Sequence, residues 1–369
     1  MAESSPLSPF GTPPSRATTA SALRVVHTHA ATAQEPLAAD GLTLSQIASR
    51  AGISRPSAEE GIAELIETGL VVETTSDPDA PRPVGRPAKR YRFRSEHGYV
   101  LGVDIGIHKV LALCADLSGH VLGSHRIEVR ADLGNDERVK AARTALKRAA
   151  RASSLRLSQV VAIGIGTTGP IDPGATIVSQ SPALPQWAGV NLRQALSGIS
   201  AGPVLADNDA NLGALAERWR GAASDSADIV YILAGHQISV GILIDGHVRR
   251  GRHGAAGEIG QLRAAGWYQA RDSLAAGRPV DDPRFIHDLA TGIAATVLTI
   301  DPDKIVIGGG LSNAGDKLLK PLRRRLHDLC MFPIPVESSH LGEQNVALGA
   351  LRLALEDVEG RLFTTPSRT

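Results

Sequence analysis

The sequence predicts an α/β protein in which an N-terminal winged helix-turn-helix precedes two α/β lobes that face a cleft. Three observations lead to this prediction. Two short helical patterns and two strands separated by a basic loop occupy residues 43–93, alternating strands and helices begin after Tyr99, and a similar alternation returns between residues 229 and 307. The chain has 369 residues, which is long enough for two or three domains.

The first segment, residues 1–20, is rich in proline, serine, threonine and alanine and has few large apolar side chains. Such a composition buries too little apolar surface to offset the entropy lost on ordering. We therefore predict a disordered leader over residues 1–20. Helical apolar spacing starts at Ser21, so the first domain is predicted to span residues 21–97 and the second residues 98–369.

Two consecutive helices carry start and stop signals. Thr43 and Gln46 have the spacing of a capping box, and the helix that they begin is predicted to end near Gly52. Ser54 can cap the second helix, Pro56 is tolerated in its first turn, and Gly69 ends it. A strand follows at residues 70–72 and another at residues 91–93, which is the order of elements in a winged helix-turn-helix.

This N-terminal domain is predicted to bind double-stranded DNA. The first residues of the second helix would face a major groove, and the loop between the strands has no acidic residue from Arg82 through Arg94. Arg86 lies between a glycine and a proline and is expected to enter a minor groove. Helix-turn-helix units also dimerise or dock proteins, and a basic loop is often only solvated. The predicted DNA-binding residues are Ser54, Arg55, Ser57, Arg86, Lys89 and Arg90.

The second half has the alternating strands and helices of two α/β lobes around a cleft. Its first part contains three strands, the last ending near Val129, and then a helix; its second part contains two strands, a helix and a further strand. The predicted strands are 100–105, 110–115, 229–233, 240–244 and 304–307, and the predicted helices are 136–153 and 285–299.

Composition excludes several classes of protein. No run of 18 apolar residues and no secretory signal is present, so we expect a cytoplasmic protein without a membrane partner. Cys114 and Cys330 are the only cysteines, which excludes a disulfide framework and a cysteine-based zinc site. The net charge of +1 argues against wholesale coating of nucleic acid, although this average hides the basic loop.

Five segments appear in an order that is specific when taken together. They read LGVDIG, GIGTTGPID, DNDANLGALAE, GAAGEIG and DKIVIGGGLS. With the preceding winged helix, the chain resembles the ROK family of repressors and sugar kinases over roughly residues 21–356. The resemblance implies an actin-like, ribonuclease-H-like pair of lobes with a hexose or amino sugar bound between them, and homodimers or homotetramers formed through this domain.

The resemblance also assigns site residues. The aspartate that acts as the base in the family's kinases corresponds to Asp209, although a carboxylate beside Asn208 can equally accept hydrogen bonds from sugar hydroxyls without chemistry. A family sugar-contacting histidine, which is also a zinc ligand, is replaced here by Gln261. The predicted effector-binding residues are Asn208, Asp209, Glu258, Gln261 and Gly169, with no metal and no cofactor.

Both phosphate loops depart from the family's kinases. The kinases carry Asp-Ile-Gly-Gly-Thr-Lys, whereas residues 104–109 read DIGIHK, and a second glycine-rich loop is replaced by GHQISVG at residues 235–241. Such loops present successive backbone N–H groups to phosphate, which Ile107 and Val240 oppose. We therefore expect no useful kinase activity.

These expectations combine into one functional prediction with two alternatives. The chain is predicted to be a transcription regulator, a repressor more than an activator, of carbohydrate-related genes that binds an inverted-repeat operator and a sugar or sugar-phosphate effector. The first alternative is an active ATP-dependent sugar kinase that retains Asp209 as its base. The second is a regulator that responds to no effector and uses the second domain as a scaffold.

Overall fold

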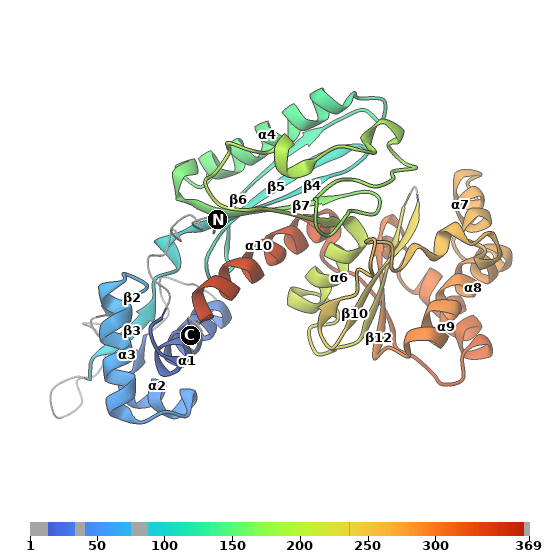
Figure 1. Cartoon of the computed structure of the whole chain (residues 1–369). Coiled ribbons are helices and arrows are strands. Elements are labelled where there is room, and N and C mark those ends of the chain that lie inside the picture. The colour runs from blue at the N-terminus through green and yellow to red at the C-terminus, as the bar shows by residue number, and fades with distance from the viewer. Residues whose placement is uncertain (1–13, 34–40, 75–87, 236, 365–369) are drawn as a thin grey trace.

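The computed structural model describes residues 14–33, 41–74, 88–235 and 237–364 (Figure 1). Three helices and a small antiparallel sheet, of strand order β1-β3-β2, form the N-terminal unit. The three helices and the two strands on either side of the basic loop follow in the order that the sequence predicts, whereas the short strand at residues 42–43 was not predicted. Its elements are α1 (Ala17–Thr32), β1 (Leu42–Thr43), α2 (Leu44–Ala51), α3 (Arg55–Glu67), β2 (Val71–Thr74) and β3 (Arg90–Phe93).

The predicted helix signals of this unit are confirmed. The Thr43 side chain accepts a hydrogen bond from the Gln46 backbone N–H while the Gln46 side chain accepts one from Thr43, which completes the capping box. Gly52 ends α2 with φ +65°, a left-handed conformation that glycine adopts without strain. Ser54 caps α3 by accepting from the backbone N–H of Ser57.

The predicted disordered leader, residues 1–20, extends too far along the chain. Helix α1 begins at Ala17, so the last four residues of the predicted leader are helical. The reason is a tertiary contact with α3: the Ser15 backbone N–H and the Thr19 hydroxyl donate to the Glu64 carboxylate at 2.7 and 3.0 Å. Thr19 and Ala20 are buried there, which composition alone does not reveal. Residues 1–13 lie outside the described residues.

The first lobe is a five-stranded sheet between two helices. Three antiparallel strands are followed by two parallel ones, in the order β6-β5-β4-β7-β8. Helix α4 (Asn135–Ala152) covers one face of the sheet and α10 (Asn345–Phe363) packs on the other, as Figure 1 shows. The strands are β4 (Tyr99–Ile105), β5 (Lys109–Asp116), β6 (Val121–Glu128), β7 (Val160–Thr167) and β8 (Val204–Asn208).

The second lobe repeats this plan with strand order β11-β10-β9-β12-β13. Helix α6 (Asp209–Arg220) packs on β9 and β10, while α8 (Pro283–Ile300) and α9 (Asp316–Leu329) form the opposite apolar core. Among the described residues, no helix is long and apolar enough to cross a membrane. The remaining elements are α5 (Leu192–Ala195), β9 (Ile229–Ala234), β10 (Ile238–Ile244), β11 (His247–Val248), α7 (Trp267–Ala275), β12 (Lys304–Gly309) and β13 (Val336–Ser338).

Helices α6 and α10 connect the lobes and pack against each other (Figure 1). Helix α6 follows β8 of the first sheet and packs on the second sheet, and α10 leaves the second lobe and returns to the first. Their backbones approach closely, because a Cβ added to Gly349 would lie 1.9 Å from the carbonyl oxygen of Leu212. Only glycine fits at this crossing.

The N-terminal unit packs directly on the first lobe. One apolar core contains Leu23 of α1 and Phe93 of β3 together with Leu355 and Leu362 of α10. The buried His27 ring donates from Nε2 to the carbonyl of Leu117 at 2.9 Å. Its centroid lies 4.9 Å from that of Phe93 and 5.3 Å from that of Phe363. Helix α10 therefore runs from the crossing with α6 to the N-terminal unit.

Candidate functional site

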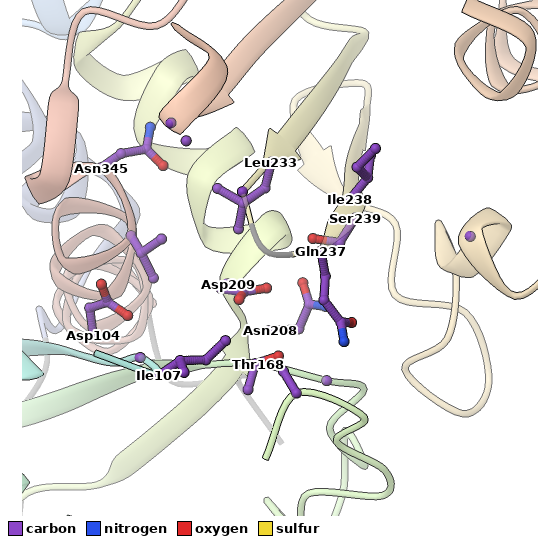
Figure 2. A pocket seen from close by; sticks show the side chains of 18 of the residues that line it. Asp104, Ile107, Thr168, Asn208, Asp209, Leu233, Gln237, Ile238, Ser239 and Asn345 are labelled. Carbon is purple, nitrogen blue, oxygen red and sulfur yellow. The ribbon is translucent and has the colours of Figure 1, made fainter. Parts of the chain in front are cut away.

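A cavity of about 610 Å³ lies between the lobes. In Figure 2, Asp104 and Ile107 come from the first lobe, Leu233 and Ser239 come from the second, and Asp209 lies between them. The cavity thus opens where the ends of β4, β8 and β9 meet the beginnings of α6 and α10. Ligands bind at this kind of position in open α/β sheets.

The turn from β8 into α6 fixes the two central polar residues. Asn208 ends β8 and caps α6, its Oδ1 accepting from the Asn211 backbone N–H at 2.8 Å. Asp209 is the first residue of the helix. Behind them, Asp207 accepts from Asn211 Nδ2 at 2.8 Å and from Arg250 Nε at 2.6 Å, which holds the turn in place.

Three of the four carboxyl groups that line the cavity lie in an environment that disfavours their charge. Burial, then the neighbouring Asp104 and Glu258 carboxylates, raise the pKa of Asp209 to about 7. Burial raises the pKa of Asp104 to about 6, although Lys109 Nζ lies 3.4 Å away and acts in the opposite direction. Burial also raises the pKa of Glu258, against a hydrogen bond from Gln261. The cavity is therefore rich in acceptors and poor in unpaired positive charge.

Gly169 lies on the loop after β7 and has φ +92°. A Cβ at this position would lie 1.9 Å from the carbonyl oxygen of Gln180, so the close approach of two loops requires glycine. Gly169, Asn208, Asp209, Glu258 and Gln261, the residues that the sequence predicts as effector-binding, all line the one cavity. Their contact with an effector stays a prediction.

The model of the family described as ROK matches residues 100–277 and 283–357. The chain belongs to the ROK family. The predicted membership and the predicted two-lobed, sugar-kinase-type fold are both confirmed.

Repressors and sugar kinases are both among the relatives of this ROK protein. A putative xylose repressor from Caldicellulosiruptor sp. (strain Rt8B.4) is 24% identical over 350 residues, covering 80% of this chain and 87% of the repressor. A glucokinase from Thermotoga maritima is 28% identical over 254 residues, covering 54% of this chain and 80% of the kinase.

Similar solved structures also include a regulator and a kinase. A ROK family transcriptional regulator, described as a homologue of the E. coli MLC protein, is 20% identical with a TM-score of 0.70, covering 94% of this chain and 98% of its own. The ROK hexokinase from Thermus thermophilus is 26% identical with a TM-score of 0.58, covering 71% of this chain and 99% of its own.

The loops that correspond to the family's phosphate loops make hydrogen bonds within themselves. The Gly106 N–H donates to the carbonyl of Lys109 at 2.9 Å, and the Gly235 N–H donates to the carbonyl of Gln237 at 3.0 Å. Ile107 projects its side chain at the cavity (Figure 2). Val240 is buried within β10 and is not among the residues that line the cavity. Of the two residues predicted to oppose phosphate, only Ile107 is placed to do so.

A buried polar network lies where α6, β9 and α10 meet. The fully buried Glu217 carboxylate accepts from Asn345 Nδ2 at 2.7 Å and from the Ser339 hydroxyl. Asn345 Oδ1 in turn accepts from the Tyr231 hydroxyl at 3.0 Å, and Tyr231 and Asn345 both line the cavity. Each member comes from a different segment, so no local motif predicted the network.

Sequence reasoning also missed one wall of the cavity. Trp267, Tyr268 and Arg271 of α7 line it, and the indole N–H of Trp267 donates to the carbonyl of Leu289 at 3.1 Å. Helix α7 begins a few residues after the GEIG segment, which is the only signal that places it near the site. Across the described residues, no group of three or more histidine, cysteine, aspartate or glutamate side chains is placed to hold a metal ion.

The predicted DNA-binding residues lie on the N-terminal unit. Arg55 is exposed in the first turn of α3, beside Ser54 and Ser57, whose hydroxyls are 2.8 Å apart. Lys89 Nζ pairs with Glu73 at 2.8 Å, and Arg90 donates to the carbonyl of Gly41 at 2.9 Å, so both side chains also make contacts within the unit. Arg86 lies outside the described residues.

Proposed function

We propose that this ROK protein is a DNA-binding transcription regulator whose cleft binds a sugar without phosphorylating it. The observation that carries the proposal is the extent of the similarity. The xylose repressor relative aligns with 80% of the chain and the regulator structure with 94%, whereas the glucokinase relative and the hexokinase structure align with 54% and 71%. The regulator structure is therefore long enough to include the N-terminal unit.

The N-terminal unit has the features that operator binding needs. Helix α3 presents Ser54, Arg55 and Ser57 at its exposed N-terminal end, from which side chains reach base edges and backbone N–H groups reach phosphates. Its other face is held by Ile62 and Leu65 in the apolar core. Lys89 and Arg90, with Arg86 on the preceding segment, supply positive charge for phosphates or a minor groove.

The cleft has the features that sugar binding needs. Asp209 and Glu258 supply carboxyl oxygens, and Asn208 and Gln261 supply amide groups, so that several hydroxyls of one sugar ring can be paired. The internally bonded Gly106 and Gly235 support binding without phosphoryl transfer, because their N–H groups already have partners within the loops.

The effect of sugar binding would be transmitted to the DNA-binding unit by a movement of the lobes. Closure on a sugar changes the angle between the lobes, and the N-terminal unit follows the first lobe because the two share one apolar core. In a homodimer or homotetramer, this motion changes the spacing of two α3 helices on an inverted-repeat operator. The affinity for DNA then differs between sugar-bound and sugar-free protein.

The test is capture of genomic fragments by the purified full-length protein, followed by sequencing. We expect enrichment of inverted repeats beside genes for sugar uptake or breakdown, and loss of that enrichment for Arg55→Ala. Arg284→Ala is the matched control, because Arg284 is exposed on α8 in the second lobe and is not part of the N-terminal unit. No enrichment by the wild-type protein would contradict DNA binding.

An active sugar kinase is the second candidate, and one observation favours it. Asp209 occupies the position of the family's base, and its pKa of about 7 suits a group that takes up a proton near neutral pH. An assay of ATP consumption with a panel of hexoses separates the two functions. Saturable turnover that Asp209→Asn abolishes would establish the kinase, while an absence of turnover together with sugar-dependent release of DNA would establish the regulator. A regulator without an effector would release DNA for no sugar.

A further inference from the structure

We propose that the cleft selects a sugar without an anionic group and discriminates against the phosphate ester of the same sugar. This inference rests on the proposed function and narrows its effector class. Two observations carry it. The lining cations and several backbone N–H groups at the cavity already have partners within the chain, and two lining carboxylates have no cationic partner among the described residues.

Two cations of the first lobe are held by carboxylates at the cavity. Lys109 Nζ lies 3.4 Å from Asp104 and also donates to the backbone carbonyl of Glu343. Arg126 donates from Nε to the Glu343 carboxylate at 3.1 Å and from Nη1 to Glu128 at 3.0 Å. A phosphate that bound either cation would have to displace these carboxylates. The displaced carboxylates would stay near the phosphate and oppose its binding.

The third lining cation lies on the opposite wall. Arg271 of α7 pairs with Asp272 at 2.9 Å, and its guanidinium lies 5.3 Å from the ring centroid of Tyr268. Its charge is therefore shared with an aromatic face and an adjacent carboxylate. The cavity offers an anion no cation whose charge is uncompensated among the residues that the structure describes.

Several backbone donors at the cavity are occupied as well. The beginning of α6 would be the natural place for a phosphate, because its first N–H groups have no partners within the helix. Here the N–H of Asn211 donates to Asn208 and the N–H of Ala210 donates to the Asp209 carboxylate at 2.9 Å. The glycine N–H groups of the two loops are used in the same way.

The two remaining carboxylates favour hydroxyl donors. For Asp209, the recorded hydrogen bonds come from backbone N–H groups, and for Glu258 the partner is the side chain of Gln261. A phosphate dianion placed beside them would repel their ionised forms and would disfavour ionisation further, whereas the hydroxyls of a neutral sugar donate to them. An amino sugar would add an attractive charge instead. Selectivity thus comes from a repulsive element as well as from attractive contacts.

The experiment is isothermal titration of the full-length protein with matched pairs: glucose and glucose 6-phosphate, N-acetylglucosamine and its 6-phosphate, xylose and xylose 5-phosphate. We expect the ester to bind at least about tenfold more weakly than its parent sugar, a difference of about 1.4 kcal/mol. Glu343→Gln removes a partner of Arg126 and should narrow this difference, whereas Glu67→Gln, at the end of α3, should leave it unchanged.

The possible results separate this inference from the proposed function. An ester that binds as tightly as its parent sugar, or more tightly, overturns the inference while leaving a sugar-responsive regulator intact. If no member of any pair binds and none releases DNA, the sugar-sensing part of the proposed function is contradicted and this inference falls with it. A preference for the parent sugar that Glu343→Gln leaves unchanged contradicts the assigned cause.

Discussion

Replacing Asp209 by asparagine should stabilise the protein while removing its response to sugar. The carboxyl group is mostly buried and lies near Asp104 and Glu258, and burial is the main reason that its pKa rises to about 7. An ionised side chain at this position costs folding free energy that the neutral, equally large asparagine does not cost. Function and stability are expected to conflict at such a residue.

The size and the sign follow from the two pKa values. The folded-state pKa of about 7 lies above the ordinary value of 3.8, so the carboxyl favours folding fully below pH 3.8, and this contribution is lost as the pH rises through 7. A shift of about three units corresponds to at most about 4 kcal/mol. The free energy of unfolding of Asp209→Asn should exceed that of the wild type by an amount that grows by about 3 kcal/mol between pH 5 and pH 8. The reason is that roughly two of the three pH units between the two pKa values lie in this range.

Urea unfolding of both proteins at pH 5, 6, 7 and 8 measures this advantage directly. Asp328→Asn is the matched control, because Asp328 is exposed on α9, and its effect should be small at every pH. Sugar binding by Asp209→Asn is measured in parallel and should be lost. An advantage that does not change with pH, or a variant less stable than the wild type at pH 8, would refute the reasoning.

Three further substitutions test other parts of the structure. Gly169→Ala should lower the free energy of unfolding in urea by at least about 2 kcal/mol, because the alanine would have a left-handed φ and its Cβ would lie 1.9 Å from a carbonyl oxygen. A decrease no larger than that of Gly174→Ala would contradict this. Leu355→Ala should cost about 2–5 kcal/mol and weaken operator binding, because Leu355 lies in the core that joins the N-terminal unit to the first lobe; unchanged DNA affinity would argue against a rigid junction. Ser54→Ala should cost about 1 kcal/mol through loss of the α3 cap, and Ser54→Asp, which can still cap, should recover most of it in the same assay.

Much of the fold could be predicted because its signals are local. The capping box at Thr43, the cap at Ser54 and the glycine after α2 each depend on residues within one turn, and the strands from Val100 onward are short apolar runs. The cavity residues of the NDAN and GEIG segments were predictable through the family resemblance, since these segments keep their order along the chain.

The features that escaped prediction depend on contacts between distant residues. Glu64 binds Ser15 and Thr19 across more than 40 residues and makes the end of the leader helical. Glu217 and Asn345 are 128 residues apart in sequence and bond only when α6 and α10 cross. Neither side chain has a spacing or a neighbour that marks it, so tertiary structure alone shows the role.

Helix α10 connects the cavity directly to the N-terminal unit. Its first residue, Asn345, lines the cavity and binds Glu217, and its last turn holds Leu362 and Phe363 against α1. A helix of 19 residues is about 28 Å long, since each residue adds about 1.5 Å. A small rotation at its cleft end therefore becomes a displacement of ångströms at the N-terminal unit. Because the unit shares an apolar core with this helix and the first lobe, we expect it to move with them. In the proposed regulator, an operator would sense that movement through a second α3 helix in a partner copy.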